Sequence, residues 1–291
     1  MATLRDIKRR INAVKNTRQI TKAMKMVAAA KLRKVQSRML QMRPYADKMN
    51  EMLSILSTTT ETELHPLLTV RPRKTIELIV ITSDRGLCGA FNSNILKTAS
   101  RFINEKRAEG FENINISVIG KKARDYFKRR NIEIRKAWTG ISGHLTYSTV
   151  QEIANEIINS YLDGVMDEVL LLYNRFKTVM TQEVTFFRLL PYQLPESPIE
   201  KTDAISSTFI FEPSQQEIYN QLLPKNIEIQ VYRALLESIA SEESARMTAM
   251  ENATKNADDM IDNLTLQFNK ARQASITKEL MDIVGGVEAL K

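Results

Sequence analysis

Apolar residues recur at alternating steps of four and three along residues 7–56 of the chain. The positions are Ile7, Ile11, Val14, Arg18, Thr21, Lys25, Ala28, Leu32, Val35, Met39, Met42, Ala46, Met49, Leu53 and Leu56. Only Arg18, Thr21 and Lys25 are polar in this series. A repeat of about 3.5 residues is typical of a coiled coil, so the series predicts one long helix with an apolar seam.

A similar seam follows in the C-terminal part of the chain. Its positions are Leu236, Ile239, Glu243, Arg246, Met250, Ala253, Ala257, Met260, Leu264, Gln267, Ala271, Ala274, Lys278 and Met281. Glu243, Arg246, Gln267 and Lys278 interrupt it. We predict that the two long helices pair as an antiparallel coiled coil; the alternative is two independent amphipathic helices in separate bundles.

Local signals predict where these helices begin and end. Thr3 and Asp6 have the spacing of a capping box, which starts the first helix near residue 4. Pro44 is expected to bend this helix without ending it, because the seam continues beyond it. Pro224 is expected in the first turn of the second helix, and Gly285–Gly286 are expected to stop it.

The middle of the chain alternates between strand and helix patterns. The predicted strands are Ile76–Thr82, Asn115–Ile119, Ile132–Lys136, Glu168–Tyr173 and Gln182–Leu189, and the predicted helices are Asn94–Lys106, Lys121–Arg130 and Thr149–Leu162. This alternation predicts an α/β fold with a mainly parallel sheet covered by helices on both faces. The positions of glycine and proline divide the chain into a central α/β domain, 73–195, and a discontinuous coiled-coil shaft, 1–60 and 210–291.

Charge is spread unevenly along the chain, whose net charge is +8. Residues 1–50 carry 14 basic side chains against Asp6 and Asp47, a net +12, whereas residues 212–291 carry a net −5. The basic head can pair with the acidic tail or bind an acidic partner. We find no apolar run long enough to span a membrane and no signal-peptide core.

Candidate chemistry is sparse. The segment Thr82–Asn92 follows the first strand, where α/β folds bind phosphate, but it lacks the glycine fingerprints of nucleotide sites, so we expect a tight structural turn. Cys88, the single cysteine, excludes an intrachain disulfide and is expected to be a buried thiol, and His144 an ordinary loop residue. We identify no catalytic residue, no metal ligand set and no cofactor site.

A second apolar stripe is displaced from the seam of the first helix. Ile20, Met24 and Val27 form it, close to the charged seam positions Arg18 and Lys25. We therefore expect residues 18–27 to present apolar side chains to something other than the paired helix, although drift of the stripe around the helix is the alternative. The polar breaks near Gln267–Lys278 are expected to lie beside this zone.

Three spaced motifs resemble those of the gamma subunit of the F-type ATP synthase. They are Leu4–Ile11 with Asn16–Ala29, then Ser83–Gly89, then Lys270–Leu280 with Ile283–Gly286, and the resemblance runs from end to end; Val287 departs from the usual alanine. It implies a non-catalytic rotor shaft with a Rossmann-like central domain, which couples proton-driven rotation of a membrane ring to ATP synthesis or hydrolysis at the beta subunits.

The resemblance also implies partners and contact residues. The partners are the alpha and beta subunits, the epsilon subunit and the membrane-embedded c-ring, with only indirect membrane association. A bacterial enzyme is expected, at the cytoplasmic face of the plasma membrane, because the cysteine-bearing insertion of the photosynthetic branch is absent. Expected contacts with the catalytic head are Met24, Lys25, Arg246, Gln273 and Thr277, and those with an acidic loop of the beta subunit are Lys31, Arg33 and Lys34.

Two other functions remain open at this point. A nucleic-acid-binding coiled coil would use the basic helix to follow phosphates, but Tyr45 is its single aromatic residue. A nucleotide-binding enzyme would use the central domain, which lacks the phosphate fingerprint. Retention on immobilised DNA and equilibrium dialysis with nucleotide test these two alternatives.

Overall fold

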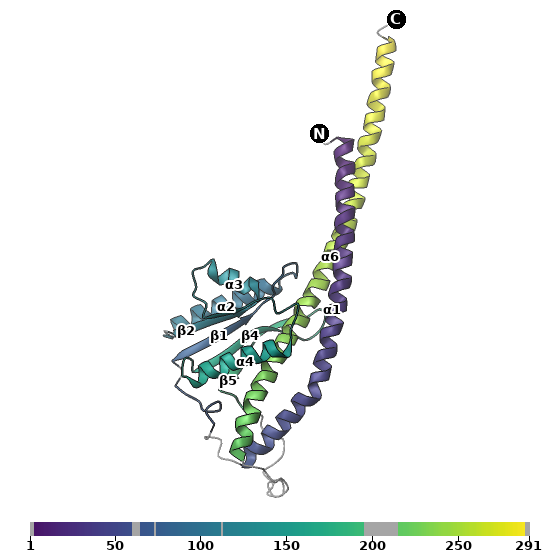
Figure 1. Cartoon of the computed structure of the whole chain (residues 1–291). Helices are drawn as coiled ribbons and strands as arrows, with labels where there is room; N and C mark the ends of the chain where they lie inside the picture. The colour runs from purple at the N-terminus through teal and green to yellow at the C-terminus, as the bar shows by residue number, and fades with distance from the viewer. Residues whose placement is uncertain (1–2, 60–64, 73, 112, 195–214, 289–291) are drawn as a thin grey trace. The chain divides into compact units, whose positions relative to one another are not determined.

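A computed structural model describes residues 3–59, 65–72, 74–111, 113–194 and 215–288 (Figure 1). The chain forms two compact units. Unit 1 contains Met1–Ala29 and Arg246–Lys291, and unit 2 contains Ala30–Ala245. The boundaries predicted for the coiled-coil and central domains remain a prediction.

Two long helices contribute to both units. Helix α1 spans Leu4–Thr59 and helix α6 spans Gln215–Glu288. The predicted capping box is confirmed: Asp6 N–H donates to Thr3 Oγ1 over 3.2 Å, and Thr3 N–H donates back to the Asp6 carboxylate over 3.1 Å. Pro44 lies inside α1, as predicted. No helix among the described residues is both long and apolar enough to cross a membrane.

The predicted ends of the second helix are wrong. Helix α6 begins at Gln215, so Pro224 lies inside it and not in its first turn. The helix also continues through Gly285–Gly286 to Glu288. Glycine in a helix interior costs only about 1 kcal/mol relative to alanine, which weakens a helix without ending it.

Five strands in unit 2 form one sheet in the order β3-β2-β1-β4-β5. The strands are β1 (Thr75–Ile81), β2 (Asn113–Ile119), β3 (Lys136–Trp138), β4 (Glu168–Phe176) and β5 (Gln182–Leu190). Strand β1 pairs in parallel with β2 and β4, and β2 with β3, while β5 runs antiparallel to β4. The long apolar run of β1 suits this central position, because both faces of the strand are buried.

Helices cover both faces of the sheet, as predicted. Helices α2 (Phe91–Ala108) and α3 (Lys121–Lys128) pack on the face to which β1 contributes Leu78 and Val80. Helix α4 (Tyr147–Leu162) and the unit 2 parts of α1 and α6 share a core with Ile79 and Ile81 on the opposite face. This alternation along β1 explains how one short strand anchors two cores.

The third strand differs from its prediction. The sequence predicts Ile132–Lys136, but β3 is Lys136–Trp138. Arg135 Nε donates to the fully buried Glu77 carboxylate over 3.0 Å, and Arg135 Nη1 donates to Glu156 over 3.0 Å. Half-buried Ile132 and Ile134 pack against the core from outside the strand. Ile132 and Ile134 therefore contribute to the core without belonging to a strand of the sheet.

Candidate functional site

The polar seam positions of α1 are paired across the antiparallel helices of unit 1. Arg18 Nη1 lies 3.0 Å from Asp258 Oδ1, and Lys25 Nζ lies 2.7 Å from Glu251 Oε1. Between them the hydroxyl oxygens of Thr21 and Thr254 are 2.8 Å apart. These three contacts fix the register of the pair, and they confirm the predicted antiparallel coiled coil in unit 1.

This register corrects one expectation. Because Arg18 lies opposite Asp258, Leu4 at the start of α1 comes opposite about Arg272. The polar breaks near Gln267–Lys278 therefore do not lie beside residues 18–27, as we had expected, but beside or beyond the first turns of α1. A heptad seam stays apolar after a shift of whole heptads, so seam positions alone do not define the register.

The last turns of α6 extend past the start of α1 in unit 1 (Figure 1). Gln273 and Thr277, both expected contacts, are exposed there. Five large apolar side chains are also exposed on this stretch: Ile276, Leu280, Met281, Ile283 and Val284. Clustered exposed apolar side chains are typical of an interaction surface, so the end of α6 is a candidate surface for binding a partner.

The displaced stripe of α1 is also accessible. Ile20 is 60% exposed and Val27 is 55% exposed, while Met24 is half-buried. Met26, which sequence reasoning did not single out, is 61% exposed on the same segment. Residues 18–27 therefore present apolar side chains away from the paired helix, as expected, while their charged seam positions are satisfied by α6.

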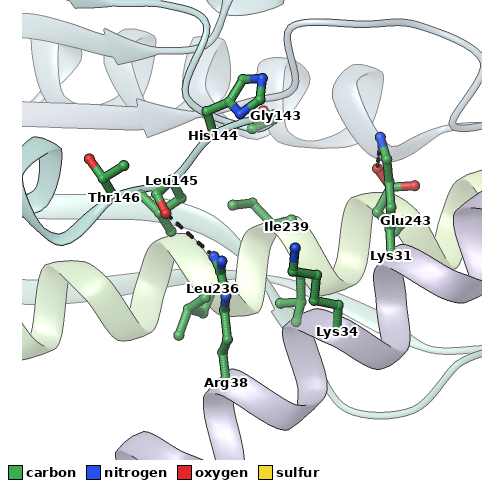
Figure 2. A pocket seen from close by; sticks show the side chains of 12 residues that line it. Lys31, Lys34, Arg38, Gly143, His144, Leu145, Thr146, Leu236, Ile239 and Glu243 are labelled. Atoms are coloured by element: carbon green, nitrogen blue, oxygen red, sulfur yellow. Dashed lines mark hydrogen bonds and ion pairs between the residues drawn. The ribbon is translucent and has the colours of Figure 1, made fainter.

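A basic pocket lies in unit 2 between α1, α6 and the loop before α4 (Figure 2). Its volume is about 300 Å³. Lys31 lies 3.6 Å from the buried carboxylate of Glu243, and Arg38 Nη1 donates to the Leu145 carbonyl oxygen over 3.4 Å. Lys34 Nζ projects into the pocket between these two groups (Figure 2).

The structure separates the three predicted basic contacts. Lys31 and Lys34 line the pocket, whereas Arg33 is exposed and is not among the lining residues. Sequence reasoning missed Arg38 and His144, which line the same pocket. The spacing of Lys31, Lys34 and Arg38 by three and four residues places them on one helix face, and this signal could have found Arg38. Nothing in the sequence indicates that the His144 loop reaches this face.

Arg246 is the one predicted contact in unit 1 that is nearly fully buried, at 8% exposure. Lys25, by contrast, keeps a side chain that is 38% exposed despite its ion pair with Glu251. Burial of Arg246 requires nearby groups to solvate its charge, because an unpaired buried guanidinium is costly. Its predicted role in partner contact is not tested by this geometry.

The turn after β1 is filled by its own side chains. The Asp84 carboxylate accepts backbone N–H groups from Lys121 and Gly140 over 3.0 Å and from Ser142 over 3.4 Å. Lys121 is the first residue of α3, where an α/β fold could place a phosphate. A carboxylate of the chain itself therefore takes the donors that such a ligand would need.

The remaining side chains of this turn form a closed network. Asn92 Nδ2 donates to Ser83 Oγ over 2.7 Å and lies 3.2 Å from Cys88 Sγ. Ser83 N–H donates to Asn92 Oδ1 over 3.1 Å. Cys88 is 2% exposed, which confirms the predicted buried thiol. Across the described residues, no three His, Cys, Asp or Glu side chains gather as a possible metal site.

Residues 3–290 match the protein family described as ATP synthase. The ATP synthase gamma chains of Anaeromyxobacter sp. (strain Fw109-5) and Geobacter metallireducens (strain ATCC 53774 / DSM 7210 / GS-15) are each 50% identical to this chain, over the full length of both proteins. The chain belongs to the ATP synthase gamma-chain family.

Solved structures of this family share the fold. A chain of the Tetrahymena thermophila mitochondrial ATP synthase central stalk and c-ring is 29% identical, with a TM-score of 0.60 over 80% of this chain and 99% of that chain. A chain of the Euglena gracilis mitochondrial ATP synthase in rotational state 3 is 21% identical, with a TM-score of 0.66 over 99% of this chain and 94% of that chain. The second likeness concerns the fold alone.

The gamma-chain motifs seen in the sequence fall on distinct parts of the structure. The segments 4–29 and 270–286 both belong to unit 1, and Ser83–Gly89 belongs to the filled turn of unit 2. The motifs therefore mark the paired helices and the turn that follows the central strand β1. The expected contact residues lie in both units. Their contacts with the alpha and beta subunits stay predictions.

Proposed function

We propose that the chain is the central rotor shaft of an F-type ATP synthase. It would couple proton-driven rotation of the membrane ring to ATP synthesis or hydrolysis at the beta subunits and carry out no catalysis itself. The observation that carries the proposal is the paired helix of unit 1, with internal polar contacts and exposed apolar side chains, in a chain 50% identical to ATP synthase gamma chains over its full length.

The geometry of unit 1 suits a shaft that turns inside a partner. The ion pairs and the Thr21–Thr254 contact hold the two helices to each other, while Ile20 and Val27 stay exposed on the outer surface. Apolar contact is non-directional, so it permits sliding that a network of directional bonds would resist. The paired helices also differ in sequence, so the shaft would offer a different face to each catalytic subunit and bias it toward one conformation.

The proposed partners follow from this role. Unit 1 would contact the alpha and beta subunits through Met24, Lys25, Arg246, Gln273 and Thr277. In unit 2, Lys31, Arg33 and Lys34 would face an acidic loop of a beta subunit. The c-ring and the epsilon subunit would bind elsewhere on the chain, which would work at the cytoplasmic face of a bacterial plasma membrane without entering it.

Reconstitution with purified alpha and beta subunits tests the proposal. We expect the chain to copurify in a complex with them and, with the membrane sector added, to support ATP-driven proton pumping. The isolated chain should hydrolyse no ATP. A chain that fails to join the head, or that binds immobilised DNA more tightly than the head, would contradict the rotor role.

A further inference from the structure

A second pocket of unit 2 lies between α1, α6 and the end of β4, apart from the basic pocket of Figure 2. Its volume is about 510 Å³, within the range of small-molecule sites. We call it the Met–Arg pocket, and its lining residues used here are Met39, Met42, Phe176, Arg43, Arg175 and Glu237. None of them belongs to the contacts proposed above.

One part of the Met–Arg pocket is apolar. Met39, Met42 and Phe176 are half-buried, and each packs on one side against the main core of unit 2. Methionine side chains are flexible and polarizable, so they adapt to ligands of different shape. This surface would receive an alkyl chain or a ring.

The rim of the pocket carries two exposed positive charges. Arg43 on α1 and Arg175 on β4 are exposed. Neither lies within ion-pair distance of a carboxylate in the described part of the chain, but Arg175 lies opposite Glu183 in the sheet and helps to lower the pKa of its carboxyl group, after Lys177, and Asp47 also lines the pocket. By contrast, the lining residues Lys177 and Arg233 are engaged with Glu183 and Glu237 at 2.8 and 3.0 Å. An exposed guanidinium can bind carboxylate and phosphate groups through paired N–H donors.

Glu237 adds a requirement for a donor. Its side chain is 7% exposed, and Oε1 accepts a hydrogen bond from Arg233 Nε over 3.0 Å. Its other oxygen, Oε2, is buried and accepts no hydrogen bond of good geometry among the described residues, although the Tyr173 hydroxyl, whose pKa burial and then the Glu237 carboxylate raise to about 12, lies near it. A buried carboxylate oxygen without a donor is costly, so a ligand N–H or O–H beside it would be favoured.

We propose that the Met–Arg pocket binds a small amphipathic anion that carries a hydrogen-bond donor next to its apolar part. The apolar part lies against Met39, Met42 and Phe176, the donor meets Glu237 Oε2, and the anionic group meets Arg43 and Arg175. The proposal is independent of the rotor role, because it needs only the fold of unit 2.

N-octanoylglycine is a suitable probe, because it joins an alkyl chain, an amide N–H and a carboxylate. We expect saturable one-to-one binding to the full chain in titration calorimetry. Arg43→Ala and Arg175→Ala should each weaken binding by roughly fivefold, the effect of losing one charge-assisted contact at an exposed rim. Arg38→Ala, which removes a guanidinium outside this pocket, is the matched control and should leave the affinity unchanged.

Two analogues of the probe test the contribution of its N–H donor and that of its carboxylate separately. N-octanoylsarcosine lacks the N–H, and N-octanoylglycinamide lacks the carboxylate, so each should bind several-fold more weakly. Glu237→Gln should abolish the preference for the N–H probe, because Arg233 would take the amide oxygen and leave an NH₂ group toward the ligand. Binding that does not saturate, or equal affinities for the unaltered chain and both rim variants, would overturn the proposal; circular dichroism would establish that each variant is folded.

Discussion

Thr21 on α1 and Thr254 on α6 meet at the centre of unit 1, with 2.8 Å between their hydroxyl oxygens. Thr21 is 8% exposed, and its hydroxyl also lies 3.0 Å from the Arg18 carbonyl oxygen. Thr254 likewise bonds the Met250 carbonyl oxygen over 2.7 Å. The two hydroxyls carry only two protons, so the hydroxyl that donates across the helices cannot at the same time donate fully to its own backbone carbonyl.

This contact predicts a measurable coupling between the two threonines. Thr21→Val should lower the free energy of unfolding by about 1 kcal/mol, because one buried hydrogen bond is lost. The double change to valine should cost less than the sum of the single changes, by about 0.5 kcal/mol. Urea unfolding followed by circular dichroism measures the cycle, and strictly additive effects would show that the hydroxyls do not interact.

Lys31 should matter more to stability than its neighbours. Lys31 lies 3.6 Å from the Glu243 carboxylate, whose side chain is only 6% exposed. Lys31→Ala should therefore cost about 1 kcal/mol, with Lys34→Ala within about 0.5 kcal/mol as the control. Adding Glu243→Gln to Lys31→Ala should restore part of the loss; thermal unfolding that ranks Lys34→Ala as the more damaging change would refute this.

Met24 and the basic cluster should affect coupling in different ways. Met24 is half-buried beside the Lys25–Glu251 ion pair, so Met24→Lys places a like charge next to Lys25. The proton pumping per ATP hydrolysed in reconstituted vesicles should fall at every salt concentration, whereas Met24→Leu should preserve it. The effect of Arg33→Ala with Lys34→Ala should shrink as salt rises, because charges are screened over about 8 Å at physiological ionic strength. If coupling in Met24→Lys and in the Arg33–Lys34 double variant depended on salt in the same way, the two sites would not act by different forces.

The capping box should make the first turn of α1 sensitive to pH. The hydrogen bond from the Thr3 hydroxyl, followed by that from the Thr3 backbone N–H, lowers the pKa of Asp6. The ionised carboxylate therefore stabilises the helix start above the pKa of an unfolded aspartate, and this contribution is lost as pH falls through the lowered folded pKa. In an NMR titration of the Asp6 carboxyl carbon, Thr3→Ala should raise the pKa and Thr3→Ser should preserve it; an unchanged pKa in Thr3→Ala would contradict the cap.

Asp84 should be a major support of the turn after β1. Asp84→Ala removes the acceptor of three backbone N–H groups, from Lys121, Gly140 and Ser142, and should cost roughly 2–3 kcal/mol. Asp84→Asn keeps one acceptor oxygen, so its stability should lie between those of the unaltered chain and Asp84→Ala. Arg85→Ala, at the exposed neighbouring position, is the control in thermal unfolding. Equal stability of Asp84→Ala and Arg85→Ala would show that the carboxylate is not needed.

Local patterns were enough to predict most elements of this chain. The alternation of apolar runs with amphipathic stretches placed β1, β2, β4, β5 and the helices between them within a few residues of their bounds, and Thr3 with Asp6 marked the start of α1. These features depend on residues close together in sequence, where side-chain spacing and hydrogen bonding decide the backbone conformation. The three motifs likewise indicated the family without any tertiary information.

Contacts between distant residues were decided only by the tertiary structure. A heptad seam is compatible with several registers, so the partners of Arg18 and Lys25 became known only from Asp258 and Glu251 on α6. Lys31 and Lys34 were visible as basic residues, yet their pocket exists because the loop before α4 and Glu243 converge on them. The sequence determined each helix face by its own periodicity, whereas the neighbour of each face depends on how segments more than 100 residues apart pack, which no local pattern encodes.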